Sequence, residues 1–182
     1  MEYFSEGKRG KIFLDTYKGK KVAIKKEKRN LGRIKNEAKW LRKLNKYNIG
    51  PKLIKSKGDQ IIYGFIEGEP FIDFYRREGK EASKDYIYEI IKQCRMMDKL
   101  GVNKFEMHKP IKHILVSGKK VIFIDFERCT KTDNPKNVTQ VCEFLVRIGF
   151  VKRTKQLTDL LKKYKSERTE TNYKGLIRFI LG

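Results

Sequence analysis

The chain has 182 residues, which is enough for one domain or for two small lobes that share a cleft. Hydrophobic residues make up 39% and aromatic residues 12%, so the chain can build a core and is not a disordered tail. No apolar run approaches the length of a membrane span, and the N-terminus lacks the basic and then apolar layout of a secretory signal.

The formal net charge is +22, and the excess is uneven. Residues 1–60 hold 19 Lys and Arg against 6 Asp and Glu. One interpretation is a surface that meets phosphates, in RNA, in a ribonucleoprotein or in an acidic partner. The other is a proteome rich in lysine, which would leave the charge without a specific use.

The cysteine pattern favours reduced thiols. The three cysteines, Cys94, Cys129 and Cys142, form no C-x-x-C pair, and their number is odd. Reduced thiols are typical of the cytosol, so we expect a cytoplasmic protein without a membrane partner.

The first part of the chain reads as a small sheet with one helix. Periodicity predicts strands at 11–17 and 20–26 around the turn Lys18-Gly19, a helix at 33–45, and strands at 52–56 and 60–66.

The remainder is predicted to be mainly helical, with one hairpin. The predicted elements are a helix at 83–100 with Ser83 as N-cap and Gly101 as stop, a hairpin of 114–116 and 121–124, and helices at 137–148, 155–164 and 171–181. This order predicts an α+β chain of two lobes, residues 1–67 and 68–182.

The helix at 33–45 carries an unusual carboxylate. Glu37 lies on the same face as the apolar Ile34 and Leu41. A carboxylate there is costly unless it finds a cation, and Lys25 at the end of the preceding strand offers one. Such a pair can hold a lysine ammonium against phosphate oxygens. The alternative is a snorkelling Lys25 and a half-exposed Glu37 that do not meet.

The hairpin brings a second group together. His113 precedes its first strand and Asp125 follows its second, so antiparallel pairing places both at one open end. The other histidine, His108, lies five residues earlier. The alternative is that Asp125 caps a turn and that the histidines are ordinary loop residues.

Two glycines precede the first predicted strand, in Gly7-x-x-Gly10-x-Ile12, with Ser5 before them. Such spacing can bring backbone N–H groups close to phosphates, although a hairpin turn rich in Gly and Lys is the simpler explanation. Further segments of interest are Val22-Ala23-Ile24-Lys25, Glu37-x-x-x-Leu41, Ile49-Gly50-Pro51, Phe65-Ile66-Glu67 and Asp125-Phe126-Glu127.

In this order, the segments resemble the protein-kinase-like superfamily over roughly residues 5–150. They are most similar to its minimal members, the RIO kinases and the small archaeal predicted serine/threonine kinases related to the kinase subunit of the KEOPS tRNA-modification complex. Val22-Ala23-Ile24-Lys25 matches the V-A-I-K strand of kinases, and Asp125-Phe126-Glu127 resembles D-F-G with Glu127 in place of glycine.

The resemblance implies a bilobal protein-kinase-like fold, with a small antiparallel-sheet N-lobe carrying one helix and a reduced, mainly helical C-lobe. ATP would lie in the cleft, with Lys25 on its phosphates, Glu37 orienting Lys25, and Asp125 binding Mg²⁺ or Mn²⁺. The other nucleotide-binding positions that it implies are Gly7, Gly10, Ile12, Ala23 and the backbone of Phe65, Ile66 and Glu67.

The catalytic loop departs from the kinase pattern H-R-D-x-x-x-x-N. Alignment on the strand at 114–116 places His108 at the base position and His113 at the second metal-ligand position. A neutral imidazole can accept a proton, so His108 is the candidate base. His113 suits Mn²⁺ better than Mg²⁺. A loop two residues shorter would instead place His108 at the first position and leave no base.

The sequence therefore predicts an atypical ATP-dependent kinase that acts on a serine or threonine hydroxyl of a protein. The alternative is a pseudokinase, a nucleotide-binding module associated with RNA or with a protein complex. A small-molecule kinase of the aminoglycoside type is a weaker alternative, since such enzymes carry a larger C-terminal lobe.

Overall fold

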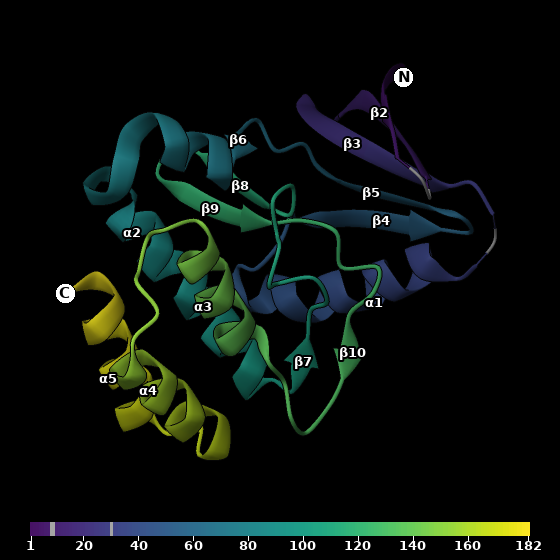
Figure 1. Ribbon diagram of the computed structural model, residues 1–182. Coiled ribbons are helices and arrows are strands. Elements are labelled where there is room, and N and C mark those ends of the chain that lie inside the picture. Colours follow the sequence, from purple (N-terminus) through teal and green to yellow (C-terminus); the bar gives the residue numbers. More distant parts are fainter. Residues whose placement is uncertain (8–9, 30) are drawn as a thin grey trace.

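The computed structural model describes residues 1–7, 10–29 and 31–182. Lys8 and Arg9, in the middle of the predicted glycine-rich segment, lie outside the described residues. Figure 1 shows a sheet with helix α1 against it and, beside them, a second part that contains the other helices.

The first part is a five-stranded antiparallel sheet with the order β1-β2-β3-β5-β4. The strands are β1 (Glu2–Glu6), β2 (Gly10–Tyr17), β3 (Lys20–Glu27), β4 (Leu53–Lys57) and β5 (Gln60–Gly64). The four predicted strands are confirmed, whereas β1 was not predicted. Lys18 and Gly19 both have positive φ, which is the conformation that a two-residue hairpin turn requires.

Helix α1 (Arg33–Leu44) agrees with the prediction to within one residue. It buries Ile34, Leu41 and Leu44, together with Glu37. A short 3-10 helix, η1 (Asn45–Tyr47), continues from its end. The inward position of Glu37 that the apolar stripe indicated is therefore present.

Helix α2 is longer than predicted, since it spans Phe71–Lys99 and is kinked at Gly79. The prediction that Ser83 is an N-cap was wrong, because Ser83 lies inside the helix and its hydroxyl donates to the Gly79 carbonyl at 2.7 Å. The apolar stripe that predicted this helix begins after the kink, so the shorter helical segment before Gly79 was not predicted. Gly101 has φ +63 and ends the helix as predicted.

The predicted hairpin is formed by β8 (Ile114–Ser117) and β9 (Lys120–Phe123), with β6 (Glu69–Pro70) at its side. A second small sheet pairs β7 (Val102–Asn103) with β10 (Thr130–Lys131). The three predicted tail helices are confirmed to within two residues as α3 (Asn137–Arg147), α4 (Lys155–Ser166) and α5 (Glu170–Leu181).

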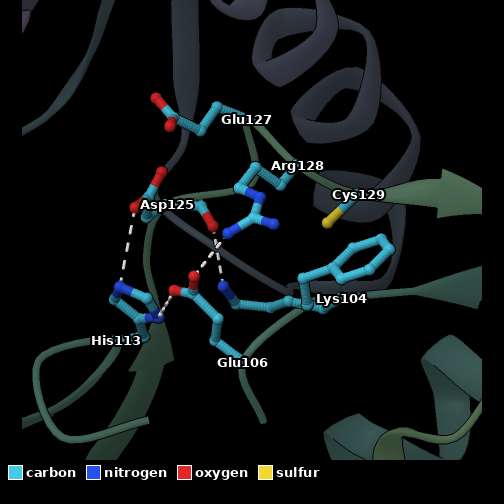
Figure 2. Close-up of a pocket in the computed structure, with 8 residues that line it drawn as sticks. Lys104, Glu106, His113, Asp125, Glu127, Arg128 and Cys129 are labelled. Carbon is cyan, nitrogen blue, oxygen red and sulfur yellow. Dashed lines mark hydrogen bonds and ion pairs between the residues drawn. The ribbon is translucent and has the colours of Figure 1, made fainter. Parts of the chain in front are cut away.

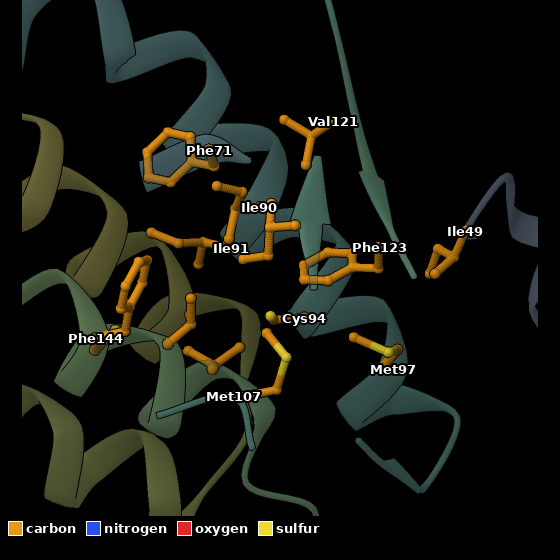
Figure 3. Close-up of a cluster of buried hydrophobic side chains, with 14 of the residues drawn as sticks. Ile49, Phe71, Ile90, Ile91, Cys94, Met97, Met107, Val121, Phe123 and Phe144 are labelled. Carbon is orange, nitrogen blue, oxygen red and sulfur yellow. The ribbon is translucent and has the colours of Figure 1, made fainter. Parts of the chain in front are cut away.

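The core of the second part forms around α2. Figure 3 shows Ile90, Ile91 and Cys94 of α2 directed toward Phe123 of β9 and Phe144 of α3. All five side chains are at most 2% exposed. Burying each such side chain contributes about 1.5–3 kcal/mol, so the hairpin is held firmly on α2.

A buried polar cluster fixes the segment that leads to the hairpin. The Asn137 amide donates to the Val102 carbonyl at 2.6 Å and to Asp98 at 2.8 Å. Its oxygen accepts from the Lys104 amide at 2.8 Å. Asn137 is fully buried, and it therefore holds residues 102–104 against the start of α3.

Cys94, Cys129 and Cys142 are buried free thiols, as their pattern indicated. Among the described helices, none combines the length and apolar character that crossing a membrane requires.

We predict that Asn137→Ala lowers the free energy of unfolding by about 3 kcal/mol, because it leaves the buried Lys104 N–H and Val102 C=O without a partner. Urea unfolding followed by circular dichroism measures this change. Gln156→Ala, at an exposed position of α4, is the control and is expected to have little effect. Equal stability of the two variants would contradict the role of Asn137.

Candidate functional site

Lys25 lies where the two parts of the molecule meet. Its ammonium is 2.7 Å from Glu37 Oε2, 3.3 Å from Asp125 Oδ1 and 3.4 Å from Glu127 Oε2. The side chain is 13% exposed. Lys25 comes from β3, Glu37 from α1, and the other two carboxylates from the segment after β9. The predicted pairing of Lys25 with Glu37 is therefore confirmed as a contact.

Glu37 also contacts the backbone of the second part. Its Oε1 accepts a hydrogen bond from the Phe126 amide at 3.2 Å, while Oε2 faces Lys25. Burial raises the pKa of Glu37, and the Lys25 cation opposes that rise. Burial disfavours the Lys25 cation, but the Glu37 and Asp125 carboxylates outweigh burial and raise the pKa of Lys25 above its ordinary value.

Asp125 lies two residues after the end of β9, and both its carboxylate and its backbone have partners. Its Oδ2 lies 3.5 Å from His113 Nε2, and its backbone carbonyl accepts from Lys104 Nζ at 2.7 Å. The Ile124 amide donates to the His113 carbonyl at 3.0 Å. The hairpin therefore brings His113 and Asp125 to one end, as the strand order predicted.

The backbone and the charge of Asp125 are both unusual. Its φ is +63, a conformation that Asp tolerates better than most side chains. Burial raises its pKa, but the Lys25 and Lys104 cations more than offset this effect, so the pKa of Asp125 lies below its ordinary value. Asp125 is therefore an ionised carboxylate, although it is largely buried.

Three carboxylates around Lys25 provide a suitable donor set for a divalent cation. One oxygen from each of Glu37, Asp125 and Glu127 lies within 4.8 Å of the others. Carboxylate oxygens are the ligands that Mg²⁺ and Mn²⁺ prefer. The Asn36 side-chain amide donates to the Glu127 backbone carbonyl at 2.9 Å, and Arg33 Nη1 lies 3.9 Å from Glu127 Oε1.

A pocket of about 10 Å³ opens beside Asp125 and is lined by Lys104, Phe105, Glu106, His113, Asp125, Glu127, Arg128 and Cys129. Figure 2 shows Glu106 between His113 and Arg128, with its carboxylate directed toward both. Glu106 lies 2.5 Å from Arg128 Nη1 and 3.9 Å from His113 Nδ1. A volume of this size holds about one water molecule, so a phosphate needs the Arg128–Glu106 pair to separate.

Glu106 was missed by the sequence reasoning. Its backbone has φ +67, which turns the chain at this point of the loop. It is the sole acidic residue between Asp98 and Asp125, and this signal could have identified it.

His108, the predicted base, is exposed and is not among the side chains that line this pocket. His113 does line it, and its Nδ1 is buried without a hydrogen-bond partner among the described residues. Burial and the nearby Lys104 cation lower the pKa of His113, so its imidazole is neutral at pH 7. A neutral imidazole is the form that binds a metal.

The predicted glycine-rich segment has one position that only glycine fits. A Cβ at Gly10 would lie 2.6 Å from the Lys26 carbonyl oxygen. The Gly7 amide donates to the Gly10 carbonyl at 2.9 Å. Ile12 pairs with Lys25 across the sheet, and Ala23 is buried opposite Tyr63.

The predicted hinge is already hydrogen-bonded at both ends. The Phe65 amide donates to the Lys21 carbonyl at 3.1 Å, and the Ser117 hydroxyl donates to the Glu67 carbonyl at 2.6 Å. These bonds fix the connection between the sheet and the hairpin on either side of Ile66. Contact of this backbone with adenine stays a prediction.

No protein-family profile and no curated protein matches the chain. Among solved structures, it is similar to the Rio2 kinase of Chaetomium thermophilum in an ADP/Mg²⁺-phosphoaspartate complex. The identity is 15%, the TM-score is 0.62, and the match covers 99% of this chain and 70% of that one.

The chain is also similar to the autoinhibited serine kinase domain of the giant muscle protein titin. The identity is 16%, the TM-score is 0.59, and the match covers 72% of this chain and 45% of that one. The matched region thus spans less than half of that domain. Together, these similarities show that the chain has a bilobal, α+β protein-kinase-like fold.

We predict that Lys25→Met lowers the free energy of unfolding by about 3 kcal/mol, because three carboxylates then face one another without their cation. Glu37→Gln is expected to cost less, since Asp125 and Glu127 still contact Lys25. The double variant is expected to lose less than the sum, with a coupling free energy of at least about 1 kcal/mol in a double-mutant cycle.

The control cycle combines Lys28→Met with Glu6→Gln, because this 2.6 Å ion pair lies in the same sheet region but is much more exposed. Its coupling is expected to be close to the measurement error. Additive effects at Lys25 and Glu37 would show that their contact does not stabilise the junction.

Proposed function

We propose that the protein is an ATP-dependent phosphotransferase that passes the γ-phosphate of ATP to a serine or threonine hydroxyl of a protein. The observation that carries this proposal is the 3.3 Å contact between the Lys25 ammonium and Asp125. It places a fixed cation from the sheet beside an ionised carboxylate from the hairpin. The kinase-like fold supports the assignment.

Lys25 and Glu37 act together on the nucleotide. The ammonium binds oxygens of the α- and β-phosphates, and Glu37 keeps the lysine side chain extended toward them. Because the Phe126 amide also donates to Glu37, the position of Lys25 is coupled to the segment that carries Asp125. Gly10 allows the β2 backbone to run close to β3 above this point.

Asp125 and His113 are the proposed metal ligands, and Glu127 adds a further oxygen. A bound Mg²⁺ or Mn²⁺ supplies neutralisation of phosphate charge. The imidazole of His113 favours Mn²⁺, since nitrogen is a poor ligand for Mg²⁺. Lys104 holds the Asp125 backbone, which keeps the carboxylate directed toward Lys25.

The transfer step requires an acceptor for the hydroxyl proton. The bond between the γ-phosphorus and its bridging oxygen breaks, a bond from the acceptor oxygen to phosphorus forms, and the products are ADP and a phosphoester. Three carboxylates line this pocket, and Glu106 is the one that is not a proposed metal ligand, so we assign it the proton. His108, the base that the sequence alignment indicates, is the competing assignment.

A second candidate function is nucleotide binding without transfer, within an RNA or protein complex. The Arg128–Glu106 ion pair lies in the pocket, and the pocket holds only about 10 Å³. If this pair does not separate, the site can bind a nucleotide through Lys25 without reaching the geometry for transfer.

We predict that the protein transfers label from γ-labelled ATP to a generic acceptor such as myelin basic protein, more strongly with Mn²⁺ than with Mg²⁺. Lys25→Ala and Asp125→Asn are each expected to reduce transfer by about 10²–10³-fold, because the first removes the cation that binds phosphate oxygens and the second removes a ligand of the metal. Scintillation counting of the acceptor measures this. Nucleotide binding that depends on Lys25, with no transfer by the parent protein, would establish the second function instead.

We predict that Glu106→Gln reduces transfer by about 10²-fold or more while the Kd for ATP changes little, because only the proton acceptor is lost. His108→Ala is the matched variant from the same loop and is expected to retain transfer. The opposite pattern, with transfer lost in His108→Ala and kept in Glu106→Gln, would return the role of base to His108.

A further inference from the structure

A large basic groove lies outside the proposed nucleotide site. It has a volume of about 1010 Å³ and is lined by Arg42, Asn45, Asn48, Gly50, Lys52, Leu53, Glu89, Gln93, Lys119, Lys120, Val121 and Ile122. None of these residues lines the pocket beside Asp125. We propose that this groove binds the sugar-phosphate backbone of a structured RNA.

The charged side chains that line the groove are mostly positive. Four cations line it, Arg42, Lys52, Lys119 and Lys120, and all four are exposed. The sole lining carboxylate in the described part of the chain, Glu89, is already paired with Lys92 at 2.8 Å. By contrast, the cation at the nucleotide site, Lys25, is surrounded by carboxylates.

The sequence around the groove reinforces this charge. The segment 42–57 contains six Lys and Arg residues and no Asp or Glu. It forms the end of α1, η1 and β4, which together make one wall of the groove. A continuous cationic segment of this kind attracts phosphates over the length of a Debye screening distance.

Both walls are held in place by hydrogen bonds. On one side, the Asn45 side chain bonds to the carbonyls of Ile49 and Pro51 and to the Leu53 amide, at 2.8–3.1 Å. On the other side, Tyr86 donates to the Gly118 carbonyl at 3.1 Å and Gln93 donates to the Val121 carbonyl at 3.0 Å. Hydrogen bonds within the protein therefore hold the backbone that carries the cations of the groove.

The chemistry of the lining favours RNA over an acidic protein. Among the described residues, no aromatic side chain lines the groove, whereas protein interfaces concentrate aromatic residues at their centre. The absence of aromatic rings there also disfavours stacking of unpaired bases. A duplex is recognised instead through phosphates and 2′-hydroxyls.

A polar group in the lining suits a hydroxyl donor. Gln93 Oε1 is buried and has no hydrogen-bond partner within the described residues. Phosphates carry no proton to donate at pH 7, whereas a ribose 2′-hydroxyl does. A turn of the Gln93 side chain toward the groove would present this oxygen to a 2′-hydroxyl, a contact that a simple polyanion cannot make.

The test uses the full chain and a labelled RNA hairpin of about 16 base pairs, the length that a duplex-binding module spans. Fluorescence anisotropy gives the Kd across a series of salt concentrations. The variant is Lys119→Gln/Lys120→Gln, and the control is Lys162→Gln/Lys165→Gln, which makes the same charge change at exposed positions of α4.

The groove variant is expected to bind RNA at least about tenfold more weakly, with the slope of log K against log salt reduced by about 2. The control is expected to keep the parent Kd and slope. Equal losses in the two variants would overturn the proposal, since binding would then follow net charge alone.

Two competitors decide the class of ligand. Polyglutamate and a DNA duplex of the same sequence are each expected to displace the RNA poorly. Displacement by polyglutamate as effective as by unlabelled RNA would mean that the groove takes an acidic protein. Equal displacement by DNA would remove the role of the 2′-hydroxyl. Either result overturns the assignment.

A second measurement needs no variant. Acetylation of lysines in the parent protein, read by mass spectrometry, is expected to be suppressed by RNA at Lys52, Lys119 and Lys120 but not at Lys162. Asp125→Asn is expected to bind RNA as the parent does, so failure of phosphoryl transfer and failure of RNA binding can be told apart.

Discussion

The ion pairs of the Lys25 ammonium connect the sheet to the rest of the molecule. It is almost enclosed, and it lies within 3.4 Å of three carboxylates from two different segments. Each carboxylate would be costly to bury alone, and together they would repel one another. The Lys25 cation offsets this repulsion, and the same cation is the group that we propose binds phosphate.

Helix α1 fixes Lys25 and the segment after β9 relative to each other. Glu37 contacts Lys25 with one oxygen and the Phe126 amide with the other, while Asn36, the preceding residue, bonds to the carbonyls of Glu127 and Cys129. Two adjacent residues of one helix thus hold both the lysine and the segment after β9. The position of Lys25 relative to Asp125 therefore depends on the position of α1.

The site around Lys25 and the basic groove differ in their balance of charge. At the proposed nucleotide site, carboxylates surround the Lys25 ammonium, so we expect binding to depend on precise positions and on a divalent metal. In the groove lined by residues of α1, α2, β4 and β9, the cations are exposed, and Glu89, the one carboxylate among the described lining residues, is paired with Lys92. Four of the 44 Lys and Arg residues therefore lie where they can attract a polyanion.

The sequence by itself determined four strands of the sheet, the hairpin, α1, the second part of α2 and the three tail helices, together with the inward position of Glu37 and the meeting of His113 with Asp125. Each depends on local periodicity or on the geometry of one hairpin, which neighbouring residues dictate. Only the tertiary structure decided that Glu106 rather than His108 faces the pocket, that Glu127 joins Lys25, and that the segment 42–57 and the turn at 117–120 line one groove. These contacts join residues distant in the chain or depend on a loop backbone with positive φ, and no repeating pattern encodes either.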